Sequence, residues 1–130
     1  MSKDITKAVP LLYEFWHDLE PWYLNKFPGR KLILTHVDRT PVEQLRLFCQ
    51  GRLPENPGEI VTWKDGFVRF SKHNYMPARA FDVAIIVGGH ADWRETAALG
   101  MVGAVEALGY AGRVRWGVIG AKDYYHFEVI

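Results

Sequence analysis

The stretch AFDVAIIV, at residues 80–87, says most about the fold of this chain. Apart from Asp82 it is wholly apolar, and its β-branched and aromatic residues predict a buried strand that Gly88 and Gly89 end. An isolated buried carboxylate costs several kcal/mol, so Asp82 needs a partner. The sequence leaves two kinds of partner open: an arginine such as Arg79 or Arg39, or a metal ion.

The segments around this strand carry helix and strand patterns. The N-terminal segment has one apolar face, and Pro21 should bend or divide its helix. That face is formed by Leu12, Phe15, Trp16 and Leu19. A later segment, residues 93–108, is apolar on nearly every side, so we expect it to be a buried central helix. The N-terminal helix is expected over 5–27, and a second helix over 41–50. Further strands are expected over 31–36, 113–116 and 125–129.

Local signals mark several of the expected ends. Thr40 and Glu43 form a capping box around a proline, which is typical of a helix start. Asp92 and Glu95 give a similar signal before the helix at 93–108. Residues 64–66 (KDG) predict a turn between two short extended pieces. Together these elements predict an α+β fold, with a small antiparallel or mixed sheet, a buried central helix and flanking helices, in a single domain over residues 1–130.

Composition narrows the class of protein. The 130 residues include 16 basic and 15 acidic side chains, a net charge of +1, and 48% hydrophobic residues. This balance predicts a packed core and lacks the basic stripe of a nucleic-acid binder. Its single cysteine excludes a disulfide framework. We expect a monomer that neither binds nucleic acid nor inserts stably into a membrane.

The N-terminal residues MSKD do not begin the uninterrupted apolar run of a signal peptide. We therefore expect the chain to be cytoplasmic when it is made. If its substrate lies outside the membrane, another protein has to give it access.

Residues with metal-binding and acid–base chemistry lie on both sides of the buried strand. In the last strand, alternation places His126 and Glu128 on one face. Asp123 must lie in the turn before that strand if it points to the same centre as His126. His73 lies in a polar loop that would have to fold back. Each also has a simpler interpretation. His126 is then a hydrogen-bonded structural histidine, Asp123 a turn or capping acid, and His73 a solvated loop histidine.

As a group, these residues have the composition of a catalytic metal site. Two imidazoles and one carboxylate are a common ligand set for catalytic zinc, which keeps its fourth position for water. A further acid can take a proton from that water. The candidate ligands are His73, Asp82 and His126, with Asp123 as the further acid. The remaining histidines, which lack acidic or histidine partners at useful spacing, are expected to be surface or structural residues: His17, His36 and His90.

The joint pattern resembles that of the zinc D-Ala-D-Ala carboxypeptidase and L-alanyl-D-glutamate endopeptidase family. Its signature is Ser-x-His, a short loop, Ala-x-Asp, and later Asp or Glu-x-x-His. The matching segments here are SKH at 71–73, AFD at 80–82 and DYYHFE at 123–128. Residues 35–44 (THVDRTPVEQ) are similar to the arginine-bearing segment of the family, and Trp116-Gly117 to its approach to the last motif. The loop between the histidine and the aspartate is longer here than in many members.

The resemblance implies a role for each matching residue. It implies three zinc ligands, His73, Asp82 and His126. It makes Asp123 the general base and Arg39 a donor that stabilises the carbonyl oxygen as it gains negative charge. It gives supporting roles to Ser71 and Gln44.

The resemblance also implies a substrate and a setting. We expect a phage-endolysin-like peptidase that cuts peptidoglycan stem peptides between L-alanine and D-glutamate. It would have no separate wall-binding domain and would reach the wall from the host cytoplasm, during lysis, through a holin-type partner. The close alternative is a carboxypeptidase that releases terminal D-alanine.

Two other classes could use the same ligand types. Non-haem iron oxygenases also bind metal with two histidines and a carboxylate, but they usually place His and Asp two residues apart on a strand of an all-β barrel. The non-enzymatic alternative is a zinc-stabilised binding module. Such a module needs neither Asp123 nor Arg39.

Overall fold

The structure is a computed structural model that describes residues 2–117 and 123–130. Its helices are α1 (Pro10–Lys26), α2 (Pro41–Cys49), α3 (Glu95–Ala98) and α4 (Ala104–Ala107), with short 3-10 turns η1 (Ile5–Lys7), η2 (Lys72–Asn74) and η3 (Leu99–Met101). Its strands are β1 (Arg30–His36), β2 (Ala80–Val87), β3 (His90–Ala91), β4 (Val114–Trp116) and β5 (His126–Val129).

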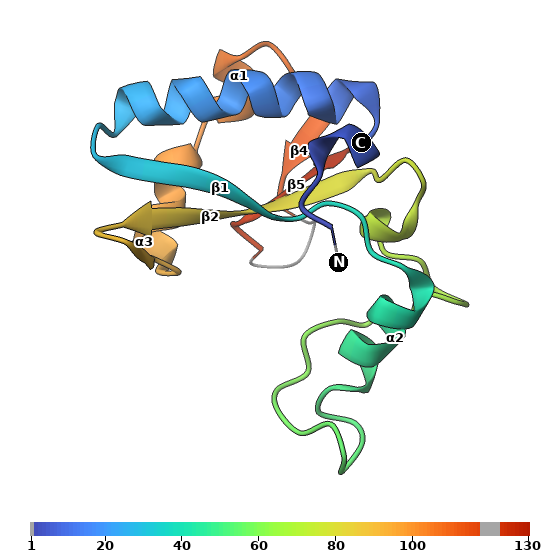
Figure 1. Cartoon of the computed structure of the whole chain (residues 1–130). Coiled ribbons are helices and arrows are strands. Elements are labelled where there is room, and N and C mark those ends of the chain that lie inside the picture. The colour runs from blue at the N-terminus through green and yellow to red at the C-terminus, as the bar shows by residue number, and fades with distance from the viewer. Residues whose placement is uncertain (1, 118–122) are drawn as a thin grey trace.

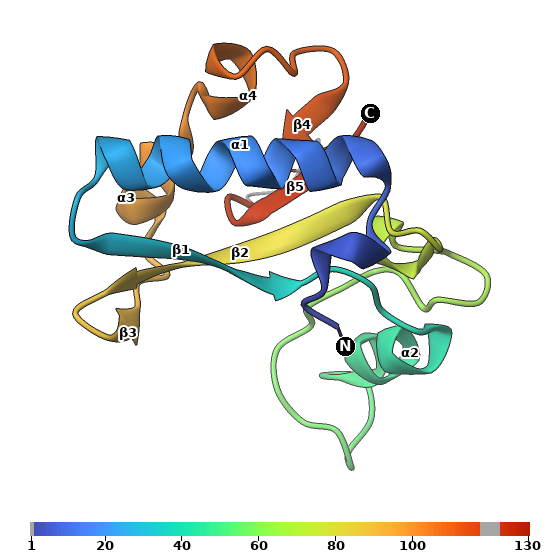
Figure 2. The same cartoon turned by 45° about the horizontal axis from the view of Figure 1, so that its top comes forward.

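The five strands form one antiparallel sheet in the order β1-β2-β5-β4, with β3 paired to β2. Helix α1 lies along one side of β1 and β2, and α2 lies on the other side in both views (Figure 1, Figure 2). The expected α+β class with a small antiparallel sheet is confirmed. The glycine-containing connection between β4 and β5 falls largely outside the described residues.

The core lies between α1 and the sheet. The Phe15 ring of α1 packs 6.1 Å from Phe81 of β2 and 5.2 Å from Phe127 of β5, measured between ring centroids. All three side chains are fully buried, and each such burial stabilises the fold by about 1.5–3 kcal/mol. Because neighbouring residues of a strand point to opposite faces, Asp82 and His126 turn away from α1. The core therefore sets the face on which the candidate ligands lie.

Helix α1 differs from the expected N-terminal helix at Pro21. The expected apolar face is buried, but α1 continues through Pro21 without division. Pro21 and His17, one turn earlier, are both exposed, so water can hydrate the carbonyl that loses its helical hydrogen bond. Residues 5–7 form a separate 3-10 turn.

The expected long central helix over 93–108 is wrong. The segment forms the short elements α3, η3 and α4, and the long helix of the fold is α1. Gly103 has a φ of +80°, a conformation that a right-handed helix cannot contain. Gly100 lies so close to Phe27 that an added Cβ would stand 2.8 Å from its ring. The segment is nevertheless apolar for the expected reason, since Ala98, Met101 and Ala104 are buried.

Of the two expected capping signals, only the first forms. Thr40 accepts from the Glu43 backbone N–H at 3.1 Å, and Glu43 accepts from the Thr40 N–H at 3.0 Å. Asp92 instead accepts from Arg94, which is itself the N-cap of α3. The chain bends at residues 66–69, just after the turn expected at 64–66, and none of the described residues 60–70 is in a strand.

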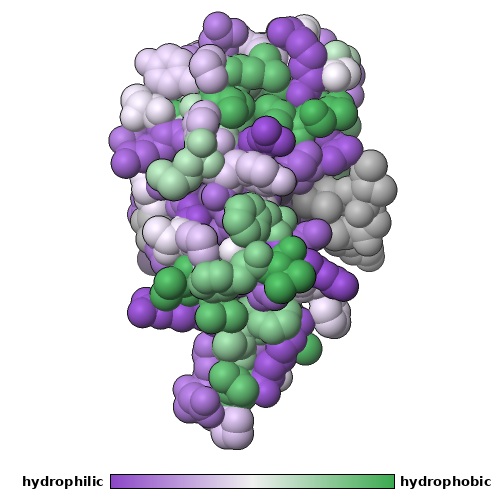
Figure 3. Space-filling model, turned by 90° about the vertical axis from the view of Figure 1, so that its right-hand side faces the viewer, coloured by the Kyte–Doolittle hydropathy of each residue, from purple (hydrophilic) through white to green (hydrophobic). Residues whose placement is uncertain are grey.

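Residues 41–70, which we call the arm, comprise α2 and the irregular segment that follows it. The arm extends away from the sheet, and hydrophobic side chains gather over it on the face seen in Figure 3. Several of these side chains are exposed, among them Ile60, Val61, Trp63, Phe67 and Val68. Among the described helices, none has both the length and the apolar character needed to span a bilayer.

Candidate metal centre and its cleft

Three side chains from neighbouring strands stand in one row on the sheet face opposite α1. Asp82 of β2 pairs in register with His126 of β5 on one side and with His36 of β1 on the other. The register of β1 shifts between Leu34 and His36, and this irregularity brings His36 opposite Asp82. The third candidate ligand, His73, comes from η2, beyond the sheet.

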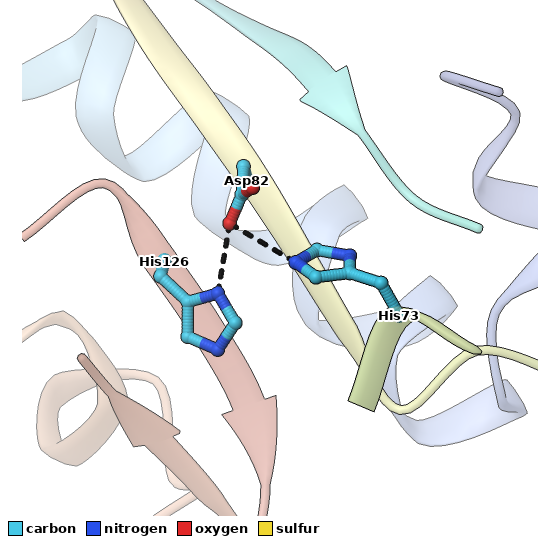
Figure 4. Close-up of side chains that lie close together, drawn as sticks. All are labelled: His73, Asp82 and His126. Atoms are coloured by element: carbon cyan, nitrogen blue, oxygen red, sulfur yellow. Dashed lines mark hydrogen bonds and ion pairs between the residues drawn. The ribbon is translucent and has the colours of Figure 1, made fainter. Parts of the chain in front are cut away.

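His73, Asp82 and His126 converge on one point (Figure 4). One ligand atom from each lies within 4.8 Å of the other two. His73 Nε2 is 3.3 Å from Asp82 Oδ1, and His126 Nδ1 is 2.8 Å from the same oxygen. The three residues named from the sequence therefore form a group that could hold a metal ion.

Each histidine is oriented through its other ring nitrogen. His73 Nδ1 donates to the Val37 carbonyl at 2.7 Å, which leaves Nε2 as the ligand atom. His126 Nε2 lies 2.8 Å from Glu128 Oε1, which leaves Nδ1. Metal-binding histidines usually donate in this way to a carbonyl or carboxylate, and the partner fixes the tautomer. The donor set and its outer partners thus fit a divalent ion that prefers imidazole and carboxylate ligands.

The two oxygens of Asp82 face different groups. Oδ1 faces the two histidines, whereas Oδ2 lies 3.4 Å from His36 Nδ1 and 3.9 Å from Arg39 Nη2. Burial acts to raise the pKa of Asp82, but hydrogen bonds from His126, His36 and His73 hold it well below its usual range. Of the arginines considered, Arg39 is the partner. Arg79 instead stacks on the Tyr75 ring at 4.3 Å.

Glu128 is the anchor of His126. It is 4% exposed and also pairs with Lys72 Nζ at 2.8 Å and Arg115 Nη2 at 2.5 Å. Burial acts to raise the pKa of Glu128, but His126, Lys72 and Arg115 lower it to about 2. For His126, burial acts to lower the pKa, whereas Asp82 and Glu128 raise it to about 9. Glu128 is therefore a charged acceptor at neutral pH.

Asp123 lies in the turn before β5, where strand geometry required it. Its Oδ2 is 3.9 Å from His126 Nδ1, the nitrogen that faces the candidate metal position. The side chain is 48% exposed, and partial burial raises its pKa, opposed by the nearby His126. An acid with a raised pKa that borders both a metal group and solvent can accept and return a proton.

Arg39 borders the same group and is held by the arm. Its Nη1 donates to Gln44 Oε1 at 2.8 Å, and its backbone N–H donates to the His73 carbonyl. Gln44, the buried polar residue of α2, donates in turn to the Lys64 carbonyl at 2.8 Å and to Thr62 Oγ1 at 3.2 Å. Gln44 thus ties the arm loop to the arginine.

Ser71 supports His73 through the backbone. Its hydroxyl accepts from the His73 N–H at 3.3 Å, and its own N–H donates to Asn74 Oδ1 at 2.9 Å. Asn74 donates to the Arg39 carbonyl at 2.9 Å. Ser71 and Asn74 therefore hold η2 against the segment that carries Arg39.

Backbone hydrogen bonds hold the end of the longer loop between His73 and Asp82. Ala78 pairs with Ala8: its N–H donates to the Lys7 carbonyl at 2.8 Å, and its carbonyl accepts from Val9 at 2.9 Å. Arg79 donates through its backbone to the Lys72 carbonyl. These bonds return the chain to the start of β2.

A cleft of about 650 Å³ lies over the candidate metal group. One wall is the sheet and η2, with the three candidate ligands, Asp123 and Arg39. The arm forms the opposite wall, with Trp63, Lys64 and Phe70 among its lining residues. The charged chemistry and the exposed aromatic rings thus face each other across one space.

The sequence prediction did not include two residues of this centre. His36 had no acidic partner nearby in sequence, and only the irregular register of β1 shows that it meets Asp82. Glu128 was placed on the face of His126, but no role was assigned to it. Its spacing of two from a candidate ligand was the signal available, because strand neighbours at that spacing share a face.

Comparison with known proteins adds a similarity of fold to solved structures. No family model matches the sequence, and no curated protein matches it either. The fold is similar to that of the Serratia marcescens L-Ala D-Glu endopeptidase ChiX, with a TM-score of 0.67 and 18% sequence identity. The match covers 97% of this chain and 83% of the endopeptidase chain. The chain therefore shares the fold of a known peptidase and carries a group that could bind a metal.

Proposed function

We propose that this protein is a zinc-dependent peptidoglycan peptidase that hydrolyses the bond between L-alanine and D-glutamate in the stem peptide. The observation that carries the proposal is the convergence of His73, Asp82 and His126 beside Asp123 and Arg39. The shared fold with an L-Ala D-Glu endopeptidase supports the choice of bond. The setting follows the sequence expectation: an endolysin-type monomer that acts on the wall after release from the cytoplasm.

The residues divide the chemistry among them. When held by the two imidazoles and Asp82, zinc supplies Lewis acidity and lowers the pKa of water towards ~7. Asp123 stands beside this position and takes the proton as water attacks the peptide carbonyl. It then returns that proton to the leaving amine. Arg39, a permanent cation next to Asp82, stabilises the oxygen that gains negative charge.

The outer residues keep this arrangement in register. His36 and Arg39 occupy Oδ2 of Asp82, so Oδ1 remains turned to the histidines. Gln44 fixes the direction of the Arg39 guanidinium. A structural metal site would not require an arginine and a second acid at its border.

Mass spectrometry of digested peptidoglycan tests the proposal most directly. The purified, zinc-loaded protein should release products with a new N-terminal D-glutamate. Release of free D-alanine would instead establish the carboxypeptidase alternative. No hydrolysis of any wall preparation by a protein that binds one zinc per chain would reject the function.

A pair of variants tests the proton carrier. Asp123→Asn should lower hydrolysis by about 10²- to 10⁴-fold while elemental analysis still finds about one zinc per chain, because Asp123 is not needed as a ligand. Glu106→Gln, at an exposed acid outside the cleft, is the matched control and should behave as the unchanged protein. Hydrolysis that survives Asp123→Asn would remove Asp123 from the mechanism.

A further inference from the structure

We propose that the arm wall of the cleft, centred on Trp63, is a binding site for the sugar strand of peptidoglycan. This inference rests on the proposed function, because it places the sugar next to the stem peptide in the same cleft. It goes beyond that function because it assigns a carbohydrate site to the arm. The proposed catalytic chemistry gives the aromatic side chains of the arm no role.

The aromatic rings of the arm are exposed where a substrate would pass. Trp63 is 69% exposed, and Phe70 is 45% exposed. Both line the cleft that also contains His73, Asp82 and His126. Exposed apolar side chains that gather beside a catalytic group usually mark a binding surface. A substrate that reaches the metal group would therefore also lie against this surface.

Trp63 is held in place despite its exposure. The guanidinium of Arg52 lies 5.1 Å from the Trp63 ring centroid and 3.9 Å from that of Phe48. Arg52 also donates to the Phe48 carbonyl. The Arg52 guanidinium therefore contacts both rings and links the indole to the end of α2. A ring ordered in advance binds a ligand at a lower entropic cost than a freely rotating one.

The chemistry of this wall suits a neutral sugar. A pyranose ring presents C–H groups on its faces and hydroxyl groups around its edge, so it stacks on aromatic rings and bonds to polar groups beside them. The arm residues that line the cleft include Val61, Thr62 and Lys64 next to Trp63 and Phe70, and none of them is acidic. The carboxylates of the cleft all belong to the opposite wall: Asp82, Asp123 and Glu128.

The position of the wall fits the proposed scissile bond. In peptidoglycan, L-alanine is joined directly to the lactyl group of the muramic sugar, and one residue spans at most ~3.6 Å. A substrate whose L-Ala–D-Glu carbonyl lies at the metal group therefore brings its sugar into the same cleft. The exposed Arg79, on the sheet side of the cleft, suits the peptide that carries the D-glutamate carboxylate.

The charge of the arm argues against an anionic lipid surface as the occupant. Residues 41–70 contain four basic and four acidic side chains, so the arm has no excess of positive charge. Proteins that bind such surfaces through an exposed segment normally combine apolar side chains with a cluster of Lys and Arg. A neutral carbohydrate needs no such cluster.

Paired substrates test the sugar site within the whole enzyme. The unchanged protein and Trp63→Ala would be assayed on a muramyl stem peptide and on the same peptide without sugar. Trp63→Ala should lower kcat/KM about tenfold more on the sugar-bearing substrate, mainly through KM, and Trp63→Phe should restore most of this difference. Trp93→Ala is the matched control, since Trp93 is 57% exposed but does not line the cleft. Equal losses on both substrates, or no loss, would overturn the proposal.

A binding measurement separates failure of this site from failure of the proposed function. Titration with the N-acetylglucosaminyl–N-acetylmuramic disaccharide, its lactyl group capped as an amide, should change the intrinsic tryptophan fluorescence of the unchanged protein and of Trp93→Ala, but not of Trp63→Ala. This result would support the sugar site even if no peptide bond were cut. Absence of a response, or a Trp63-dependent self-association or vesicle binding in place of it, would overturn the proposal.

Discussion

The sheet body and the arm hold their side chains by different means. The body buries a continuous apolar core in which Phe15, Phe81 and Phe127 meet between α1 and the sheet. No residue of the arm, all of which is described, contributes a buried hydrophobic side chain. The buried residues of the arm are Gln44 and Gly66. These two residues pack so closely that a Cβ added to Gly66 would stand 2.8 Å from the Cβ of Gln44.

This difference matches the work that each region does in the proposed enzyme. Metal ligands must be held within tenths of an ångström, and strands packed on a core provide that precision. A wall that contacts a long polymer instead needs exposed apolar surface, which a core would remove from reach. Polar groups rather than apolar burial therefore join the arm to the body, chiefly through Gln44 and Arg39.

The largest expected effect compares a phenylalanine from each region. Phe81→Ala should lower the free energy of unfolding by about 3–5 kcal/mol, because it leaves a cavity under the strand that carries Asp82. Phe67→Ala, at a 58% exposed position in the arm, should change it by less than about 0.5 kcal/mol. Urea unfolding of the two variants measures both values. Similar losses would show that the arm has a core of its own.

The second prediction concerns the zinc affinity of the sheet body and involves no residue of the arm. Glu128→Gln keeps an oxygen near His126 but removes the charge that faces Lys72 and Arg115. We expect zinc affinity to fall about 10- to 100-fold, as is usual when the outer partner of a histidine ligand is changed. Competition with a zinc chelator gives the affinity, with Glu106→Gln as the control. An unchanged affinity would mean that Glu128 serves stability only.

The junction between the regions gives the third prediction. Gln44→Ala removes the acceptor of Arg39 and the donor to the arm loop, so it should lower the free energy of unfolding by about 1–3 kcal/mol. It should also lower kcat while zinc affinity stays unchanged, because no ligand contacts Gln44. Gln50→Ala is the matched control for stability, since Gln50 donates to one carbonyl within the arm, at Glu59. A fall in zinc affinity would show that the arm also shapes the metal group.

The sequence allowed the sheet body to be predicted better than the arm. Strand alternation and the apolar run at 80–87 identified β2, and the motif pattern named three residues that the structure brings together. The segment at 93–108 was predicted to be one helix because its composition gives no sign of the contact between Gly100 and Phe27 or of the left-handed Gly103. Both depend on tertiary packing.

The contacts of the centre could be predicted only in part. His36 meets Asp82 through an irregular register between strands 46 residues apart, which no local pattern encodes. Gln44 was assigned a supporting role from the resemblance, but its bonds to Thr62 and Lys64 require a loop whose path has no secondary structure. Long-range polar contacts of this kind are visible only once the backbone is placed.

The smallest expected effect is a pH dependence confined to the arm. The Asp65 carboxylate accepts from the backbone N–H groups of Arg69, Phe67 and Val68, and these hydrogen bonds lower its pKa. Because the folded pKa lies below the unfolded value of about 3.9, the stabilisation is present above that pH and is lost as pH falls through the folded pKa. NMR titration of the three amides should show a midpoint below about 3.9, and Asp65→Asn should abolish it. The core is held by apolar burial at Phe15, Phe81 and Phe127, so it should stay folded through this transition. Loss of the folded core signals at the same midpoint would show that the arm loop and the body unfold as one unit.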